Sequence, residues 1–372
     1  MVVLGLETSC DETAAAVVAE TDDPARPWAI RSNIVASQTG IHREWGGVVP
    51  ELASRQHVRD ICGVVERALA DASAGLGDLG AIAVTQGPGL VGSLLVGVAF
   101  AKALAASLGV PLVPVNHLAG HIESLFLEHG LLPLPAIVLV VSGGHTNLYL
   151  VPAPGAYRLL GRTRDDAAGE AYDKVAKLLG LGYPGGPVID RRATLGADRA
   201  VDLPSMRITH PDRRTPHDPG RMDFSFSGLK TAVLRIVRAR TEANRPLSEQ
   251  EISDLCASFQ RVVVETLLDR TFEAASRHGA LSIGIAGGVS ANSRLREDAR
   301  RRGEARGLPV FVPRLALSTD NAAMIAAAGL RAHAAGAHDG RDLVGDAHDL
   351  LALLRVEPKI VGVDEHGAAV SG

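Results

Sequence analysis

Two histidines four residues apart, His117 and His121, are the residues whose types and spacing point most directly to chemistry. They lie in the segment VNHLAGHIESLFL, Val115–Leu127, where Asn116 is a suitable N-cap and apolar residues recur at helical spacing. At this spacing both imidazoles leave one face of a helix and can converge on a single metal ion. The alternative is a pair of unrelated histidines on a polar helix face, which is the commoner outcome for an isolated HxxxH pair.

A carboxylate that would complete such a metal site is offered by Asp320, which precedes the apolar segment AAMIAAAGL. An aspartate at the start of a helix is by default an N-cap. It is also a rigid oxygen ligand, and two histidines with one carboxylate form a common metal-binding set that leaves coordination positions open. The residues alone leave both interpretations open.

Glycine pairs follow two buried apolar segments. Ser142-Gly143-Gly144-His145 follows the segment AIVLVV, and Gly287-Gly288 follows IGIA. Paired glycines let backbone amides approach an acyl or phosphate group without an intervening side chain. Ser142 with His145 also suggests a serine hydrolase, but the strand–elbow–helix context of GxSxG is missing, so the amide site is favoured. The glycine-rich run Gln86–Gly97 fits no phosphate-binding motif, and we expect tight helix packing there.

The elements that must position these residues predict an α/β protein with an internal duplication. Strand-like segments at 2–6 and 14–19 flank the hydroxyl-rich, acidic turn 7–13, and the segments around residues 136–151 repeat the strand–turn–strand plan. Apolar periodicity predicts helices from residue 50 to about 70, over 169–180 and over 249–278. Asp173 falls in the second of these helices, where an exposed charge pair with Lys177 is the structural alternative to a binding role.

Composition sets the broad class of the protein. The chain has 372 residues, of which 46% are hydrophobic and 22% charged, which predicts two domains or a duplicated fold with a sizeable core. Three widely separated cysteines suggest reduced thiols, and neither a signal segment nor a twenty-residue apolar run is found. We therefore predict a soluble cytoplasmic protein without a membrane segment.

The formal net charge of the chain is −4 at pH 7. A negative protein is not attracted to nucleic acid by its overall charge, so bulk electrostatics argues against nucleic-acid binding. The segment Arg191–Arg245, called here the basic strip, nevertheless holds 12 Lys and Arg against 6 Asp and Glu. Such a local excess is either a patch that meets a polyanion or a solvated loop.

Taken in order, nine blocks of this sequence resemble the tRNA adenosine threonylcarbamoyltransferase family, also called TsaD or Gcp. The blocks span roughly residues 3–330 and are LETSCDET, GGVVPELASRQHV, GPGLVGSLLVG, NHLAGH, LVVSGGHTNL, DDAAGEAYDKVAKLLGLGYPGGP, FSFSGLKTAV, AGGVSAN and STDNAAMIA. The resemblance implies a duplicated actin-like ATPase fold of the ribonuclease H-like type, with two subdomains and a central cleft. We expect one subdomain over 1–113 with a return at about 320–345, the other over 114–319, and a tail over 346–372.

The resemblance also implies an activity. Members transfer the threonylcarbamoyl group from threonylcarbamoyl-AMP to N6 of adenosine 37 in tRNAs that read codons beginning with A, which forms t6A. Carried over by position, the metal ligands would be His117, His121 and Asp320, and the single divalent metal would be iron, Fe(2+). The residues that would contact the adenylate are Val140, Val141, Ser142, Gly143, Gly144, Asp173, Gly186, Asp190 and Asn292. No catalytic residue is assigned, and Glu12 is only a candidate proton acceptor.

The implied partners are tRNA, a small actin-like paralogue of the TsaB type and an ATPase of the TsaE type. The basic strip is the candidate surface for tRNA phosphates, including Arg213 and Arg214. Two departures from the family pattern stand out. Ala119 replaces a bulkier or polar residue between the histidines, which should not cost the metal. After Arg331 the expected Arg-Pro-rich ending is replaced by LVGDAHDLLALLRVEP, which leaves the role of the tail open.

Three other function classes compete with this interpretation. A nucleotide-dependent small-molecule kinase or ATPase is the main alternative, because the expected fold binds nucleotides. A metal-dependent peptidase of the HExxH type lacks its base, since residue 118 is Leu. A non-catalytic binding module of the heat-shock type would not need the histidine pair.

Overall fold

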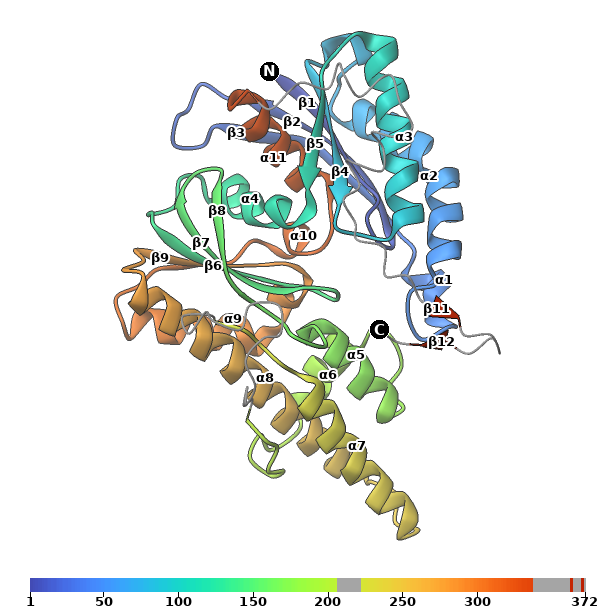
Figure 1. Cartoon of the computed structure of the whole chain (residues 1–372), viewed down its shortest axis with the longest axis vertical. Helices are drawn as coiled ribbons and strands as arrows, with labels where there is room; N and C mark the ends of the chain where they lie inside the picture. The colour runs from blue at the N-terminus through green and yellow to red at the C-terminus, as the bar shows by residue number, and fades with distance from the viewer. Residues whose placement is uncertain (206–221, 337–361, 364–368, 371–372) are drawn as a thin grey trace.

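Two five-stranded sheets with the same strand plan form the core of the protein (Figure 1). The computed structural model describes residues 1–205, 222–336, 362–363 and 369–370. The first sheet has the order β3-β2-β1-β4-β5, from β1 (Val2–Glu7), β2 (Glu12–Glu20), β3 (Trp28–Ser37), β4 (Ala81–Gly87) and β5 (Leu112–Asn116). The second has the order β10-β9-β6-β7-β8, from β6 (Ala136–Val141), β7 (Thr146–Ala153), β8 (Ala156–Arg162), β9 (Ser282–Ala286) and β10 (Val310–Phe311).

The pairing directions confirm the predicted duplication. In the first sheet β1, β2 and β3 form an antiparallel meander, and β4 and β5 add parallel to β1. In the second sheet β6, β7 and β8 form the same meander, and β9 and β10 add parallel to β6. Each half therefore places the carboxyl ends of three parallel strands at one edge of its sheet, where open α/β sheets bind ligands.

Helices cover the faces of both sheets. Their bounds are α1 (Thr39–Arg43), α2 (Pro50–Asp71), α3 (Val91–Leu108), α4 (His117–His129), α5 (Ala168–Leu178), α6 (Gly185–Ala193), α7 (Ser227–Glu242), α8 (Glu249–Arg277), α9 (Ser293–Glu304), α10 (Leu315–Ser318) and α11 (Ala322–Ala334), with 3-10 turns η1 (Leu76–Asp78) and η2 (Gly288–Ala291). The short strands β11 (Gly362–Val363) and β12 (Ala369–Val370) pair with each other. The helices predicted for 50–70 and 249–278 are confirmed, and the one predicted for 169–180 ends at Leu178.

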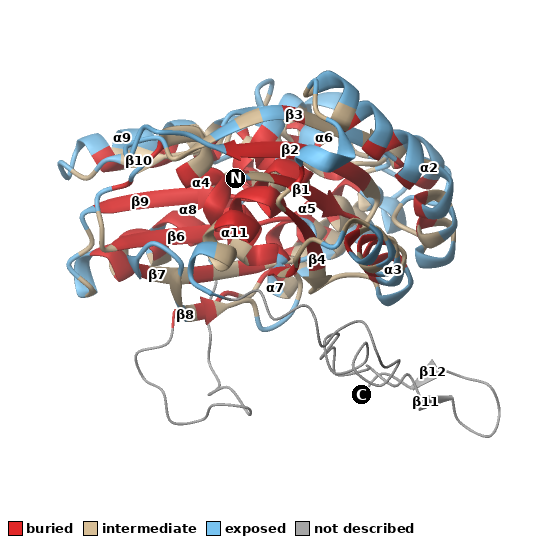
Figure 2. Cartoon of the chain, turned by 90° about the horizontal axis from the view of Figure 1, so that it is seen from above, coloured by how far each residue is buried: buried red, intermediate tan, exposed pale blue. Residues whose placement is uncertain are grey.

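The strands β1, β2, β6 and β9 are buried on both faces, whereas the edge strands β3 and β8 are largely half-buried or exposed (Figure 2). Along β6, Ile137 and Leu139 join the core beneath α8, while Val138 and Val140 join the core that α4 completes. Along β1, Leu4 and Leu6 face α2 and α3, while Val3 and Gly5 face α11. Because both faces are covered, β6 is apolar along its whole length and β1 is apolar up to Glu7.

Small residues bring α11 close to the first sheet. A Cβ atom at Gly5 would lie 2.3 Å from the carbonyl oxygen of Ala322 and 2.7 Å from the amide nitrogen of Ala326. A Cβ at Gly120 on α4 would lie 2.8 Å from Ile325 Cδ1. The helix α11 is thus packed between β1 and α4 at distances that no larger residue allows.

The predicted division into subdomains stays a prediction. The return of the chain to the first sheet is seen in α11, whereas residues 337–345 and most of the tail 346–372 lie outside the described residues. Within the described ranges α3 alone has the length and apolarity of a membrane-spanning helix, with a mean hydropathy of 1.8 over 18 residues. A core helix of a soluble protein passes the same test, and the inner face of α3 packs against the first sheet.

Replacing Gly5 with Val should destabilise the protein, because the side chain would overlap the backbone of α11, and overpacking of this kind costs about 1–3 kcal/mol or more. Urea unfolding measures the loss. The matched control is Gly63→Ala, in an exposed position of α2 where a Cβ meets no atom within 4 Å, and this variant should be more stable by up to about 1 kcal/mol. Equal free energies of unfolding for Gly5→Val and the wild type would show that the stability of the protein does not depend on the close packing of α11 against β1.

Candidate metal centre

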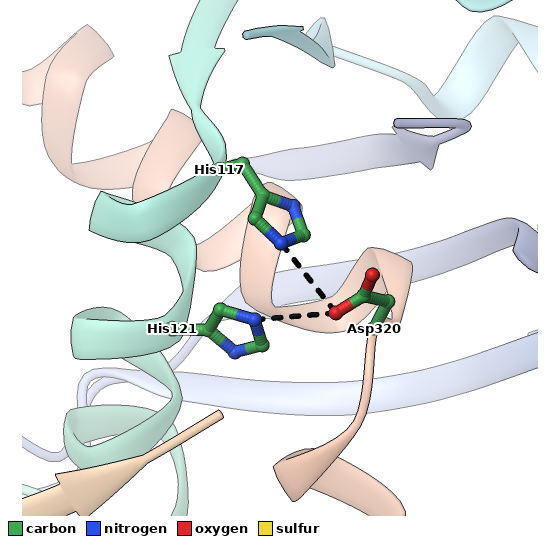
Figure 3. A group of neighbouring side chains, drawn as sticks. All are labelled: His117, His121 and Asp320. Carbon is green, nitrogen blue, oxygen red and sulfur yellow. Dashed lines mark ion pairs between the residues drawn. The ribbon is translucent and has the colours of Figure 1, made fainter. Parts of the chain in front are cut away.

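Two side chains from α4 and one from the loop before α11 converge between the sheets (Figure 3). His117 and His121 come from the first two turns of α4, and Asp320 directly precedes α11. Asp320 Oδ1 lies 3.4 Å from His117 Nε2 and 3.2 Å from His121 Nε2. One possible ligand atom from each residue lies within 4.8 Å of the others. The histidine pair and the carboxylate, which are far apart in the sequence, therefore meet in the structure.

The start of α4 is set by Asn116, as predicted. Its side-chain oxygen accepts hydrogen bonds from the amides of Leu118, at 2.9 Å, and Ala119, at 3.3 Å. Because β5 ends at Asn116, His117 becomes the first residue of the helix at the carboxyl end of a parallel strand. The cap therefore fixes the direction in which both imidazoles project.

The alternative role of Asp320 as an N-cap is wrong. Asn321 caps α11, because its side-chain oxygen accepts a hydrogen bond from the amide of Met324 at 3.1 Å. Asn321 is fully buried, and this arrangement leaves the neighbouring carboxylate to face the imidazoles. The side chain of Asp320 keeps 20% of its surface accessible, so the group of three is reachable from solvent.

Glu7, at the end of β1, holds the second nitrogen of His117. His117 Nδ1 lies 2.9 Å from Glu7 Oε2, and the same oxygen accepts a hydrogen bond from Thr85 Oγ1 at 2.6 Å. The sequence interpretation missed this role, although a fully buried acid at the end of an apolar strand signals a bound partner. A carboxylate on the far nitrogen of an imidazole is the usual way to orient a metal-binding histidine.

The charges of this cluster are strongly coupled. Burial by itself would lower the pKa of His117, but Asp320 and Glu7 outweigh it and hold that pKa well above its usual value. Burial would likewise raise the pKa of Asp320, yet His117 and His121 hold it well below its usual range. The pKa of His121 is lowered, first by burial, and this favours the neutral imidazole that binds metals.

The donor set fits a divalent metal. Nδ1 of the fully buried His121 has no hydrogen-bond partner among the described residues, and Nε2 has only the ion-pair contact with Asp320 at 3.2 Å. A buried nitrogen without a hydrogen bond is costly. An ion bound by His121, His117 and Asp320 would form a coordination bond with Nε2 of His121. Two imidazoles and one carboxylate that leave positions open are typical of non-haem Fe(II) sites.

A buried ion pair holds α4 and α11 together on the far side of this group. Glu123 is fully buried, and its Oε1 lies 2.7 Å from Nε of Arg331 and accepts a hydrogen bond from the hydroxyl of Tyr157. The guanidinium of Arg331 also stacks between Trp28, at 4.5 Å, and Phe126, at 5.0 Å. The contact joins β3, α4, β8 and α11 at one point, so it ties the two sheets to the helix pair that carries the metal group.

The glycine turn lies beside the histidines. The rings of His145 and His117 are 6.5 Å apart. The amide of His145, rather than its ring, donates to Ser142 Oγ, so no Ser–His pair of the hydrolase type is formed. Burial, followed by the charges of His117 and His121, lowers the pKa of His145 to about 4.

Glycine in this turn is not required by packing. A Cβ at Gly143 or Gly144 would meet no protein atom within 4 Å, and neither residue has a positive φ. Val140 and Val141, in contrast, are the buried last residues of β6, so only their backbones are available to a ligand.

Asp173 and Gly186 lie where α5 meets the start of α6. The carboxylate of Asp173 accepts a hydrogen bond from the amide of Gly185 at 2.7 Å. It is Lys174, not Asp173, that forms the ion pairs of this helix, with Asp166 at 2.7 Å and Glu170 at 2.8 Å. The pKa of Asp173 is raised, first by burial and then, among charges, by Asp11, so the turn after β1 faces α5.

Asp190 and Asn292 are brought together from distant parts of the chain. The carboxylate of Asp190 accepts hydrogen bonds from Gln260 Nε2, Asn292 Nδ2, and the amide and hydroxyl of Ser293. Asn292 also caps α9 by accepting from the amide of Leu295. Both side chains are thus engaged within the protein, and their backbones and remaining lone pairs are what a ligand would meet.

The basic strip is only partly described. Arg213 and Arg214 lie outside the described residues. Within the described part, Arg192 pairs with Glu249, and Arg240 pairs with Glu251 at 2.7 Å. These pairs reduce the free positive charge of the strip.

Comparison with known proteins shows which family the sequence matches. The family described as TsaD, tRNA N6-adenosine threonylcarbamoyltransferase, matches residues 29–327. The enzyme of that name from Koribacter versatilis is 48% identical over 93% of this chain and 98% of its own length. The one from Anaeromyxobacter dehalogenans is 52% identical over 92% and 98%. The solved structure of T. kodakarensis HypF is 15% identical, covers 92% of this chain and 49% of its own, and has a TM-score of 0.58, which supports the predicted fold class.

Replacing Glu7 with Gln should weaken metal binding by about 10- to 100-fold, because the uncharged amide no longer polarises His117. Metal titration of the stripped protein measures the affinity. Glu66→Gln, on the exposed face of α2, is the matched control and should bind as the wild type does. An unchanged affinity in Glu7→Gln would show that this contact only supports the fold.

Proposed function

The chain belongs to the tRNA N6-adenosine threonylcarbamoyltransferase family, and on this basis we propose that it transfers a threonylcarbamoyl group to N6 of adenosine 37 in tRNAs that read codons beginning with A. The product is t6A. The single observation that carries the proposal at the site is the convergence of His117, His121 and Asp320 beside the glycine turn. The proposed donor is threonylcarbamoyl-AMP, a mixed anhydride.

The reaction joins a weak nucleophile to an activated carbonyl group. The adenine N6 amine attacks the carbamoyl carbon, a C–N bond forms, and the bond from that carbon to the phosphate oxygen breaks as AMP departs. The amine loses one proton in the process. The site must therefore hold the two substrates close together and stabilise negative charge on the carbonyl oxygen and the phosphate.

The proposed metal ligands are His117, His121 and Asp320, with Glu7 orienting His117. A divalent ion, proposed to be Fe(2+), would supply Lewis acidity and a template for the threonylcarbamoyl group. The low pKa of Asp320 keeps this ligand ionised at neutral pH. Partial accessibility of the same side chain leaves a side of the group open to substrate.

The turn Ser142–Gly144 is proposed to bind the carbamoyl oxygen or the phosphate through backbone amides. Open space around Gly143 and Gly144 supports this assignment, since nothing in the protein fills it. The glycines then serve the ligand rather than the fold.

The remaining predicted contacts are assigned to the nucleotide. Asp173 and Asp190 are proposed to meet ribose hydroxyls, with Gly186 and Asn292 placing the nucleotide backbone. Glu12 stays a candidate proton acceptor. Burial, followed by the charges of Asp11 and Asp320, raises its pKa well above the ordinary value, which makes its carboxylate a stronger base once it is ionised.

The proposed partners are tRNA, a small actin-like paralogue and an ATPase, and the proposed location is the cytoplasm. A negative net charge supports the need for help in presenting tRNA. A small-molecule kinase of the same fold is the alternative function, and it would need magnesium rather than a histidine-bound metal.

Replacing His117 or Asp320 with Ala should empty the metal site and abolish transfer, because two ligands do not hold the ion. Metal analysis and mass spectrometry of nucleosides from treated tRNA provide the two measurements. His278→Ala, a half-exposed histidine at the end of α8, should keep both metal and activity. Full transfer by metal-free His117→Ala would remove the Lewis-acid role.

Replacing Gly143 with Ala should leave the melting temperature unchanged and lower transfer on the order of 100-fold, because the methyl group enters space assigned to the acyl or phosphate group. The comparison variant Gly77→Ala has equally open surroundings on η1 and should be fully active. Normal activity in Gly143→Ala would move the anion site away from this turn.

A further inference from the structure

Trp45 is among the most exposed large apolar side chains of the described residues, at 63%. The chain has only two tryptophans, and the other, Trp28, packs on Arg331. Leaving an indole in water forgoes the largest burial free energy that a side chain offers. Single exposed apolar residues are common, so the construction of the loop around Trp45 decides what it means.

The loop is anchored on both sides of Trp45. The amide of Trp45 donates to the carbonyl of His42 at 3.0 Å, and the amide of Gly47 donates to the same carbonyl. The amide of Val49 donates to His42 Nδ1, and the ring of His42 is fully buried. The indole is therefore presented on a fixed backbone, which lowers the entropy lost when it binds a partner.

A chain of buried hydrogen bonds connects this loop to the turn after β1. Because His42 Nδ1 accepts from Val49, its Nε2 donates to Gln38 Oε1, at 3.2 Å. The amide of Gln38 then donates to His57 Nδ1, at 3.3 Å, and His57 Nε2 donates to the carbonyl of Cys10, at 3.0 Å. These hydrogen bonds connect the Trp45 loop to the turn after β1.

The loop also reaches α5. A Cβ at Gly46 would lie 3.8 Å from Lys177 Nζ, and Lys177 lies one helical turn beyond Asp173 on α5. Trp45 therefore stands at the edge of the region assigned to the substrate.

The charge around Trp45 suits an anionic partner. Arg43 and Lys177 are exposed, and neither forms an ion pair within the described part of the chain. Glu44 is the one acid of the same loop. An exposed aromatic ring flanked by unpaired cations is the arrangement with which proteins stack unpaired bases and contact their phosphates.

We propose that Trp45 is a stacking platform for an unpaired nucleobase of the RNA loop that carries the reacting adenosine, with Arg43 and Lys177 meeting the adjoining phosphates. This rests on the proposed function, because only an RNA substrate brings a single-stranded loop to this edge. Stacking tolerates any base, so the platform would position the loop without selecting its sequence.

Binding of a short RNA hairpin with the adenosine in its loop tests the proposal on the full-length protein as purified. Hairpin addition should quench the tryptophan fluorescence of the wild type, and Trp45→Phe should lose this quenching while it keeps most of the affinity. Trp45→Ala should bind about 5- to 100-fold more weakly and raise KM for the RNA more than it lowers kcat. Metal content and melting temperature should not change.

Leu281→Ala removes a 54% exposed side chain just before β9, at the opposite end of the strands, and serves as the control. Wild-type hairpin affinity in Trp45→Ala overturns the proposal. Loss of transfer by that variant only when partner proteins are present, with hairpin binding intact, also overturns it and assigns Trp45 to a protein contact. Failure of the proposed function is a separate result, in which the wild-type protein modifies no RNA.

Discussion

The packing of α4 against α11 is the constraint on which the rest of the site depends. Each helix covers the inner face of a different sheet, so the contact between them is also the contact between the two halves of the duplicated fold. Gly120 allows the close approach, and the Glu123–Arg331 pair fixes it further along the helices. A buried ion pair is weak evidence for stability, since apolar replacements are often as stable, but this pair joins α4 to α11 at one defined position along both helices. That restriction is what a metal group drawn from α4 and from the loop before α11 needs.

Electrostatics in the metal group follows from this packing. His117 is held between Glu7 and Asp320, so its two nitrogens face two carboxylates that come from opposite ends of the chain. Without an ion, the raised pKa of His117 lets a proton offset part of the negative charge. A divalent ion would offset the negative charge of the carboxylates with a larger positive charge. Glu7 would then orient the neutral His117 ring as a metal ligand instead of pairing with its protonated form.

Two kinds of glycine serve two purposes in this protein. Gly5, Gly120 and Gly284 sit where a Cβ would strike a neighbouring element, so they set the distances between strands and helices. Gly143, Gly144 and Gly186 have open space instead, and they line the region assigned to the adenylate. The space around the missing Cβ therefore separates glycines that allow close packing from glycines that leave room for a substrate. The sequence alone does not distinguish the two groups.

The sequence by itself determined the elements and the chemistry of the ligands. Periodicity placed the long helices, the repeated strand–turn–strand plan indicated the duplication, and local capping chemistry identified Asn116, because these signals depend only on neighbours along the chain. The tertiary structure alone decided which contacts form between residues far apart. It brought Asp320 to the two histidines, placed Glu7 behind His117, and engaged Asp190 with Asn292. These outcomes depend on how two sheets and two helices pack, and no local pattern encodes the distance between positions separated by a hundred residues or more.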